Sequence, residues 1–123
     1  MATVSRPKYV KKNVRNVAPE LRLAVVGEAL SRGVTTSDVV GEILSEQWSI
    51  PYVPSGEKPM GLELTGQQFI LKMPRMMAYR AEQMSRTSGF TESSVIQMAL
   101  SEHYDIPFQP VRRGRKPRAE ETA

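Results

Sequence analysis

Lysine and arginine gather at the two ends of this chain, where they are suited to bind a polyanion. Residues 1–16 and residues 110–118 contain ten of the 17 basic residues and no acid. Residues 17–109 hold the other seven basic residues against 11 acids, so the middle is mildly acidic. Basic arms on a small domain are typical of proteins that bind nucleic acid. The alternative is that the arms only aid solubility.

Other kinds of chemistry find little support in the residues. Cysteine is absent, which excludes disulfides and thiolate zinc sites. The single histidine, His103, is interpreted as a surface residue of a helix. We find no paired acid and base, no nucleophile with its base, and no phosphate-binding loop. The sequence therefore predicts no enzyme, no catalytic residue, no metal and no cofactor.

The segments expected to position the basic residues occur twice in the sequence. Residues 33–54 read GVTTSDVVGEILSEQWSIPYVP, and residues 89–110 read GFTESSVIQMALSEHYDIPFQP. Ten of these 22 positions are identical and the alignment has no gap, so the chain is an internal duplication. Each unit is marginal alone because it buries too little surface. We expect the two halves to share one core.

Each half is predicted to contain one short strand and two helices. In the first half, a strand is expected over residues 12–17, a helix over 19–32, and a second helix from Thr35 to about Trp48. In the second half, QFILKM (68–73) alternates as a strand does, a helix begins at Pro74, and another follows Thr91. Gly33 and Gly89 end the first helices, and the two threonines cap the second ones.

This pattern resembles the ribbon-helix-helix family of DNA-binding proteins. The resemblance is carried by FILKMPRMM with SGFTESSVIQMALSEHY, and by VRNVAPELRL with SRGVTTSDVVGEILSEQW. It implies a mainly α fold with a short two-stranded antiparallel ribbon, here a tandem ribbon-helix-helix pseudo-dimer within one chain. Pairing between swapped chains is the alternative. The predicted organisation is a basic arm (1–11), repeat 1 (12–50), a linker (51–66), repeat 2 (67–108) and a basic tail (109–123).

In the family, outward side chains of the ribbon read bases in the major groove. Applied to the second strand, the resemblance implies that Gln68, Ile70 and Lys72 meet bases. The first strand is less regular. Counting from Pro19 turns Asn13, Arg15 and Val17 outward, whereas counting back from Gly33 turns Val14 and Asn16 outward. A bulge would resolve the conflict, and we favour Asn13 and Arg15 as base-reading residues.

The resemblance also implies phosphate contacts at the start of each second helix. These would come from Thr35, Thr36, Ser37, Thr91 and Ser93, while Lys8 and Lys11 of the arm and Lys12 at the start of repeat 1 add further contacts. The run RRGRKPR offers Arg112, Arg113, Arg115, Lys116 and Arg118. It is similar to an AT-hook that enters the minor groove, and the alternative is a non-specific phosphate-binding tail. Glu92 is badly placed near a phosphate, which predicts unequal contacts in the two halves.

The predicted function is sequence-specific binding of double-stranded DNA by a transcriptional repressor. Two alternatives are an architectural, nucleoid-associated protein with weak sequence preference and an antitoxin-type autoregulator. The family resemblance further implies self-association on DNA. No apolar run approaches a membrane span and no signal peptide is evident. We therefore expect a cytoplasmic protein without membrane contact, encoded by a bacterial chromosome, a phage or a plasmid.

Overall fold

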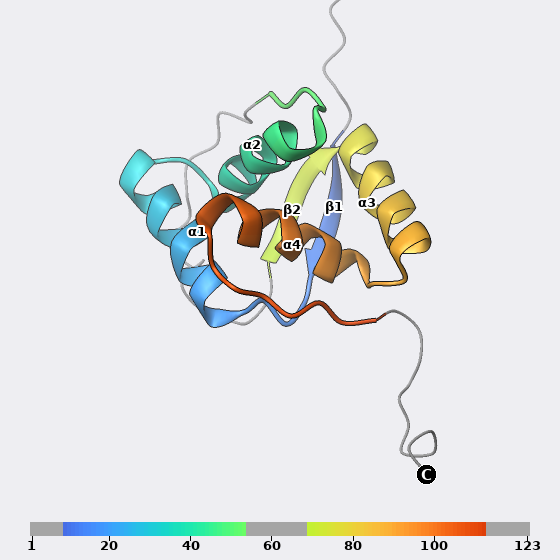
Figure 1. Ribbon diagram of the computed structural model, residues 1–123. Helices are drawn as coiled ribbons and strands as arrows, with labels where there is room; N and C mark the ends of the chain where they lie inside the picture. Colours follow the sequence, from blue (N-terminus) through green and yellow to red (C-terminus); the bar gives the residue numbers. More distant parts are fainter. Residues whose placement is uncertain (1–8, 54–68, 113–123) are drawn as a thin grey trace, which may run out of the picture.

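Two strand–helix–helix units form the fold (Figure 1). The computed structural model describes residues 9–53 and 69–112. The first unit contains β1 (Tyr9–Val14), α1 (Pro19–Arg32) and α2 (Thr36–Trp48), and the second contains β2 (Phe69–Pro74), α3 (Arg75–Ser88) and α4 (Glu92–Tyr104). The predicted class, mainly α with a short two-stranded antiparallel sheet, is confirmed.

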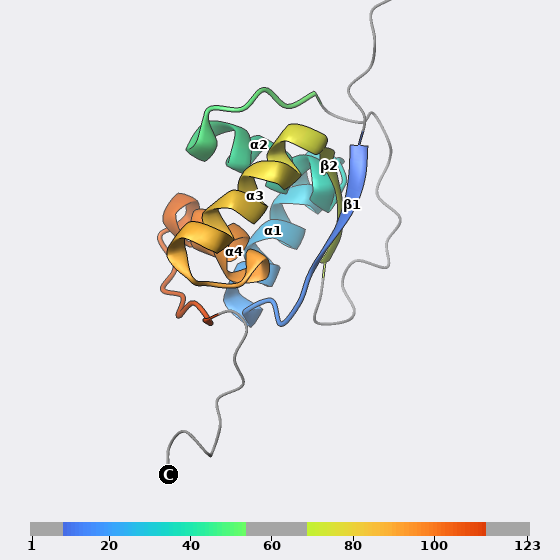
Figure 2. The same cartoon turned by 90° about the vertical axis from the view of Figure 1, so that its right-hand side faces the viewer.

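The two strands pair with each other and cover one side of the molecule. β1 runs antiparallel to β2, with Lys11 opposite Lys72 and Asn13 opposite Ile70. In β2 the buried side chains are those of Phe69, Leu71 and Met73, and the exposed ones are those of Ile70 and Lys72. This alternation follows from the two-residue period of a strand. Figure 2 shows the helices on one side of the sheet, so the sheet has one core face and one outer face.

The two units are interlocked through the sheet and through their second helices. α2 packs against β2, α4 packs against β1, and α2 and α4 pack against each other. In Figure 1, α4 crosses in front of both strands. Leu44 and Leu100, which share one position of the repeat, are both fully buried in this core. A two-stranded ribbon is marginal alone, and this packing supplies the cover that it needs.

The predicted glycine ends of the first helices and threonine caps of the second helices are confirmed in both units. Gly33 and Gly89 have φ angles of 70° and 84°, the left-handed conformation that favours glycine. Thr35 and Thr91 cap α2 and α4, and each hydroxyl accepts a hydrogen bond of 3.0 Å from the backbone N–H three residues later. The repeated Gly-x-Thr motif therefore forms the same turn twice.

The first strand lies earlier in the chain than predicted. β1 ends at Val14, whereas the prediction extended from residue 12 to residue 17. Asn16 leaves the extended conformation with a φ of 51°, which asparagine tolerates better than most residues. Val17 then returns to the core. Residues 9–11, predicted as part of a basic arm, therefore belong to the sheet.

Two other predicted boundaries also change. Pro74 ends β2 and is the N-cap of α3, so the helix begins one residue later than predicted, at Arg75. The predicted tail was to begin at residue 109, yet its first residues are docked on the turn between α3 and α4. There the backbone N–H of Thr91 donates to the carbonyl of Val111 at 2.9 Å. The backbones of Phe90 and Arg112 form an isolated antiparallel β-bridge. Most of the predicted linker and tail lies outside the described residues.

Candidate nucleic-acid interface

The outer face of the sheet displays two rows of exposed side chains. Lys11 and Lys72 form one cross-strand pair, and Asn13 and Ile70 form the next. The Ile70 side chain is 60% exposed, although it lies among polar neighbours. These four residues come from the two strands, and the structure brings them together on one face. Gln68, also predicted to lie here, is outside the described residues.

Arg15 extends this face beyond the end of β1. The backbone N–H of Lys72 donates to the Ser37 hydroxyl at 3.0 Å, and that of Arg15 donates to the Ser93 hydroxyl at 2.9 Å. Ser37 and Ser93 occupy the same position of the repeat, so Arg15 holds the place in the first unit that Lys72 holds in the second. Both side chains are exposed. The favoured interpretation, with Asn13 and Arg15 outward, agrees with this placement.

Val17 departs from that interpretation. Counting from the proline turned Val17 outward together with Asn13 and Arg15, yet the side chain of Val17 is buried. Asn16, with its positive φ, forms a bend just after the end of β1, which we call the bulge, and the alternation reverses there after Arg15. The sequence alone left the position of this bulge open.

Lys12 lies on the inner side of β1, unlike its two neighbours. Its side chain is 16% exposed, and its amino group contacts Glu92 at 2.6 Å and Glu82 at 3.4 Å. The predicted role of Lys12 as a phosphate-binding residue does not agree with this position. Its charge instead faces Glu92, the acid at the start of α4. The pair reduces the negative potential at that helix end.

The hydroxyl groups predicted to bind phosphate are already engaged within the protein. Thr35 and Thr91 cap their helices, and Ser37 and Ser93 accept from the sheet backbone. A hydroxyl that accepts a hydrogen bond keeps its own O–H to donate. Thr36 is buried at the first position of α2. The serines and the backbone N–H groups of the first turn are therefore the groups best suited to meet an anion here.

The segment after α4 brings one more cation, Arg112, to the N-terminus of α4. Its backbone is held by Val111, whose N–H donates to the hydroxyl of Ser94 at 2.8 Å. The Arg112 guanidinium lies 5.1 Å from the centre of the Phe90 ring, a cation–π distance. Arg112 is thereby positioned beside the N-terminus of α4. Lys8 and the other predicted tail cations, Arg113, Arg115, Lys116 and Arg118, lie outside the described residues.

In the first unit the segment after the second helix also returns to that helix. The hydroxyl of Tyr52 donates to the carboxylate of Asp38 at 2.6 Å and also contacts the carbonyl of Ser37 at 3.3 Å. Burial, together with this carboxylate, raises the pKa of Tyr52 well above its ordinary range. Tyr52 is therefore a neutral donor at any ordinary pH. Tyr52 thus contacts the first turn of α2 and brings no charge to it.

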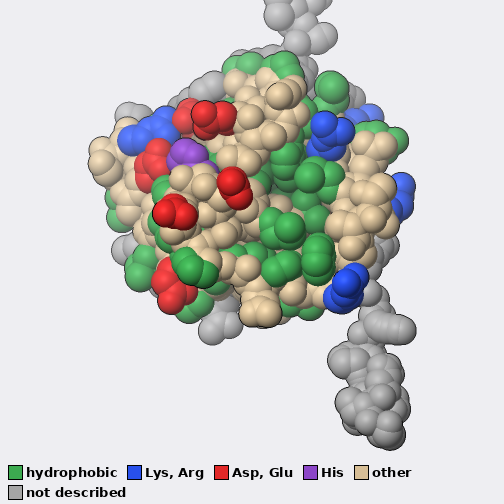
Figure 3. Space-filling model, viewed as in Figure 1, with side chains coloured by type: hydrophobic (Ala, Val, Ile, Leu, Met, Phe, Trp, Pro, Cys, Tyr) green, Lys and Arg blue, Asp and Glu red, His purple; other side chains and the backbone are tan. Residues whose placement is uncertain are grey.

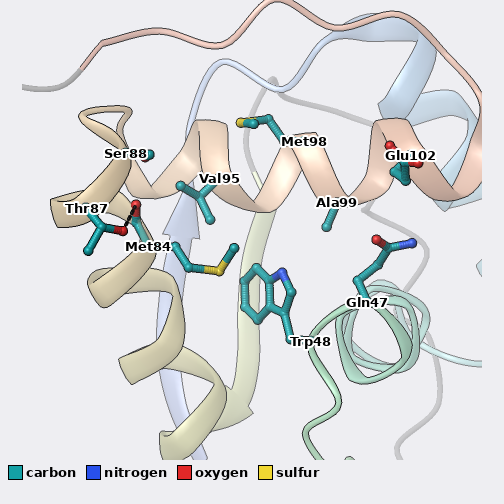
Figure 4. Close-up of a pocket in the computed structure, with 9 residues that line it drawn as sticks. All are labelled: Gln47, Trp48, Met84, Thr87, Ser88, Val95, Met98, Ala99 and Glu102. Carbon is teal, nitrogen blue, oxygen red and sulfur yellow. Dashed lines mark hydrogen bonds between the residues drawn. The ribbon is translucent and has the colours of Figure 1, made fainter.

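The helical side of the molecule carries a groove that residues of both units line. The groove has a volume of about 380 Å³ and lies between the C-terminal ends of α2 and α3 and the middle of α4 (Figure 4). Figure 4 shows Trp48, Met84 and Met98 around its apolar part. Gln47, Thr87, Ser88 and Glu102 add polar atoms at the edge.

The place that corresponds to this groove by the repeat is closed by a polar network. Tyr104 donates to Glu28 at 2.6 Å, and Arg32 bridges Glu28 and Glu42 at 2.9 and 2.7 Å. Figure 3 shows this side of the molecule, with carboxylates and the histidine gathered away from an apolar area. The hydrogen bond from Tyr104 lowers the pKa of Glu28, with a further contribution from Arg32. The two units therefore share a fold but differ in surface chemistry.

Within residues 9–53 and 69–112, no three acidic, histidine or cysteine side chains gather as they would around a metal ion. No helix in these two ranges is long and apolar enough to cross a membrane. Comparison of the chain with protein-family models, curated protein sequences and solved structures found no match. The candidate site is thus defined by its own geometry, an exposed two-stranded sheet flanked by two helix N-termini.

Proposed function

We propose that this chain is a tandem ribbon-helix-helix protein that binds double-stranded DNA and represses transcription by occupying an operator. In this proposal the two units act as the two subunits of a pseudo-dimer. The observation that carries it is the matched pair of hydrogen bonds from the sheet backbone to Ser37 and Ser93. These bonds attach each end of the sheet to the N-terminus of a helix. A groove-binding ribbon and two anion-binding helix ends then form one continuous surface.

The dimensions and the side chains of the sheet suit the major groove. The major groove of B-DNA admits a two-stranded ribbon and presents a distinct donor and acceptor pattern for each base pair. Lys72 and Arg15 are suited to guanine acceptors, and Asn13 is suited to adenine. Lys11, which the sequence predicted to bind phosphate, pairs with Lys72 on the same face and is also suited to a guanine acceptor. The exposed Ile70 is suited to contact the methyl group of thymine. Such a contact would account for an isoleucine side chain that is exposed among polar groups.

The remaining cations suit the DNA backbone. The N-terminal turns of α2 and α4 would each receive a phosphate, and Arg112 would add a charge beside α4. Contacts of this kind fix the position of a protein on the duplex and carry no sequence information themselves. Specificity would therefore come from the sheet, and much of the affinity from the helix ends and the basic arms.

The test is selection of bound sequences from a random duplex pool at about 0.15 M salt, where non-specific binding is moderate. The wild-type chain is compared with Gln68→Ala/Lys72→Ala and with Arg80→Ala. Arg80 is exposed on α3, outside the sheet, and supplies a control for loss of one positive charge. We expect a defined motif that the double variant loses in part and the Arg80 variant retains.

The opposite result would favour an architectural protein. The wild type would then enrich no motif, and removal of residues 113–123 would abolish binding while the double variant bound as the wild type does. A steep salt dependence with little preference for any sequence would mark the same outcome.

A further inference from the structure

Counted from the equivalent residues Arg15 and Lys72 to the start of the first helix, the first unit has one more residue than the second. α1 and α3 begin at residues 19 and 75, so the helices are offset by 56 positions. Arg15 and Lys72, which make equivalent bonds to Ser93 and Ser37, are offset by 57 positions. Three residues separate Arg15 from α1, but only two separate Lys72 from α3. Asn16, with a φ of 51°, accommodates the extra residue.

A single buried side chain from the other unit holds this bulge. Gln97 of α4 is 2% exposed. Its Oε1 accepts from the backbone N–H of Ala18 at 2.8 Å, and its Nε2 lies 3.3 Å from the carbonyl of Asn16 and 3.4 Å from that of Arg15. The side-chain amide thus satisfies backbone groups that have left the strand and not yet entered the helix. Buried groups of this kind are costly without a partner.

The second unit needs no such residue and has none. Gly41 occupies the repeat position of Gln97, and a Cβ atom there would lie 2.2 Å from the ring of Tyr52. The counterpart of Ala18 is Pro74, the N-cap of α3. Proline has no backbone N–H, so nothing there requires the acceptor that Gln97 provides to Ala18. The glutamine is therefore found only in the unit that packs against the bulge, and the strand–helix–helix arrangement itself does not require it.

We propose that Gln97 is a positioning residue that sets the place of Arg15 and thereby the base preference at one end of the DNA site. This inference rests on the proposed function. Gln97 is buried and would not touch DNA. It acts through the Arg15–Ala18 turn, which carries the guanidinium at the end of the sheet. The hydrogen bonds of Gln97 within the described residues go to the Arg15–Ala18 turn, so the base preference at the Lys72 end should be independent of this residue.

The experiment uses the full chain and the same random duplex pool. Arg15→Ala and Lys72→Ala first identify the base positions that depend on each side chain. Gln97→Ala is then expected to lose preference by roughly tenfold at the Arg15 positions, the size expected for one base contact. Preference at the Lys72 positions is expected to be unchanged.

Two further variants separate positioning from general loss of stability. Ser94→Ala removes another buried polar group from α4, a hydroxyl that contacts the C-terminal segment and not the bulge. We expect it to retain preference at both ends. In Gln97→Ala/Ala18→Pro the second change removes the N–H that lost its acceptor. Ala18 already has φ −60° and ψ 135°, which suit proline, so this variant is expected to recover preference at the Arg15 positions.

The outcomes are distinct. A wild-type chain that enriches no motif would overturn the proposed function and this inference with it. A motif that Gln97→Ala retains in full would overturn the inference alone. Equal loss of preference at both ends in Gln97→Ala, without recovery in the double variant, would also overturn it, because a merely structural residue would behave in that way. Loss confined to the Arg15 end, with recovery, would support it.

Discussion

Two glycines within helices, Gly41 and Gly27, differ in what surrounds them. Gly41 of α2 lies beneath the ring of Tyr52, whereas nothing lies within 4 Å of the Cβ position of Gly27 in α1. The close approach at Gly41 allows Tyr52 to reach Asp38 at the start of α2. Gly27 is exposed and has no such neighbour.

We expect Gly41→Ala and Gly27→Ala to change stability in opposite directions. Gly41→Ala forces the tyrosine ring away and should lower the free energy of unfolding by about 1–3 kcal/mol, as overpacking does. Gly27→Ala should raise it by about 0.5–1 kcal/mol because alanine loses less backbone entropy in a helix. Urea unfolding of the two variants measures both values. A stable Gly41→Ala protein would show that Tyr52 is not held over the helix.

The hydrogen bond between Tyr104 and Glu28 makes a prediction about pH. The pKa of Glu28 lies below its ordinary value of 4.5, first because of Tyr104 and then because of Arg32. A carboxyl whose pKa is lower in the folded state stabilises the fold above its unfolded pKa. That contribution disappears as the pH falls through the folded pKa. The relevant window therefore lies below about pH 4.5.

Tyr104→Phe should raise the pKa of Glu28 toward its ordinary value. The stability difference between variant and wild type should be largest near neutral pH and should shrink as Glu28 is protonated. Carboxyl chemical shifts followed by NMR give the pKa directly. Tyr79→Phe is the matched control, since the Tyr79 hydroxyl contacts Gln83 and no carboxylate in the described residues. An unchanged Glu28 pKa in Tyr104→Phe would contradict the assignment.

At the scale of elements, the starts of α2 and α4 differ in charge. The first residue of α4 is Glu92, and the first residue of α2 is Thr36. Lys12 offsets the Glu92 carboxylate, but this acid still lies where the proposed function places a phosphate. The Glu92 carboxylate would repel a phosphate bound at this helix end, and added salt would screen that repulsion.

Under the proposed function, Glu92→Thr should strengthen DNA binding by about two- to fivefold at low salt, the range expected for one charge at a helix end. The gain should diminish as salt is added. Fluorescence anisotropy with a fixed duplex at two salt concentrations tests this expectation. Glu82→Gln removes the other acid partner of Lys12 from α3 and controls for the broken ion pair. Equal gains in both variants would argue against a phosphate at α4.

Local patterns predicted most elements but not how β1 continues into α1. The alternation of Phe69 to Met73 and the Gly-x-Thr turns were sufficient for β2 and the helix ends, because these signals lie within a few residues. The bulge at Asn16 is hydrogen-bonded by Gln97, which is 81 residues away in the chain. No local period contains that contact. The same holds for Lys12, whose inward position depends on acids from α3 and α4.

At the scale of the whole molecule, the two units are expected to unfold together. Each second helix packs against the strand of the other unit, and the strands pair with each other. Neither unit alone would keep its core covered. A chain that contains both units should therefore unfold in one cooperative transition.

The midpoint of thermal unfolding should not depend on protein concentration over roughly a hundredfold range, because both units lie on one chain. A fragment of residues 1–53 should be unfolded at low concentration, since β1 has lost β2 and α2 has lost α4. Circular dichroism at several concentrations measures both. A midpoint that rises with concentration for the full chain would indicate that strands are exchanged between molecules.

The pairing of β1 with β2 within one polypeptide also affects how such a surface can evolve. In an assembly of two identical chains, every mutation of the strand appears twice, and both ends of a bound ligand must tolerate it. Here a single codon change alters Arg15 without altering Lys72, or Asn13 without altering Ile70, although each pair holds equivalent places in the two units. One end can thus acquire a new preference while the other is retained. Duplication followed by divergence allows recognition to change one step at a time.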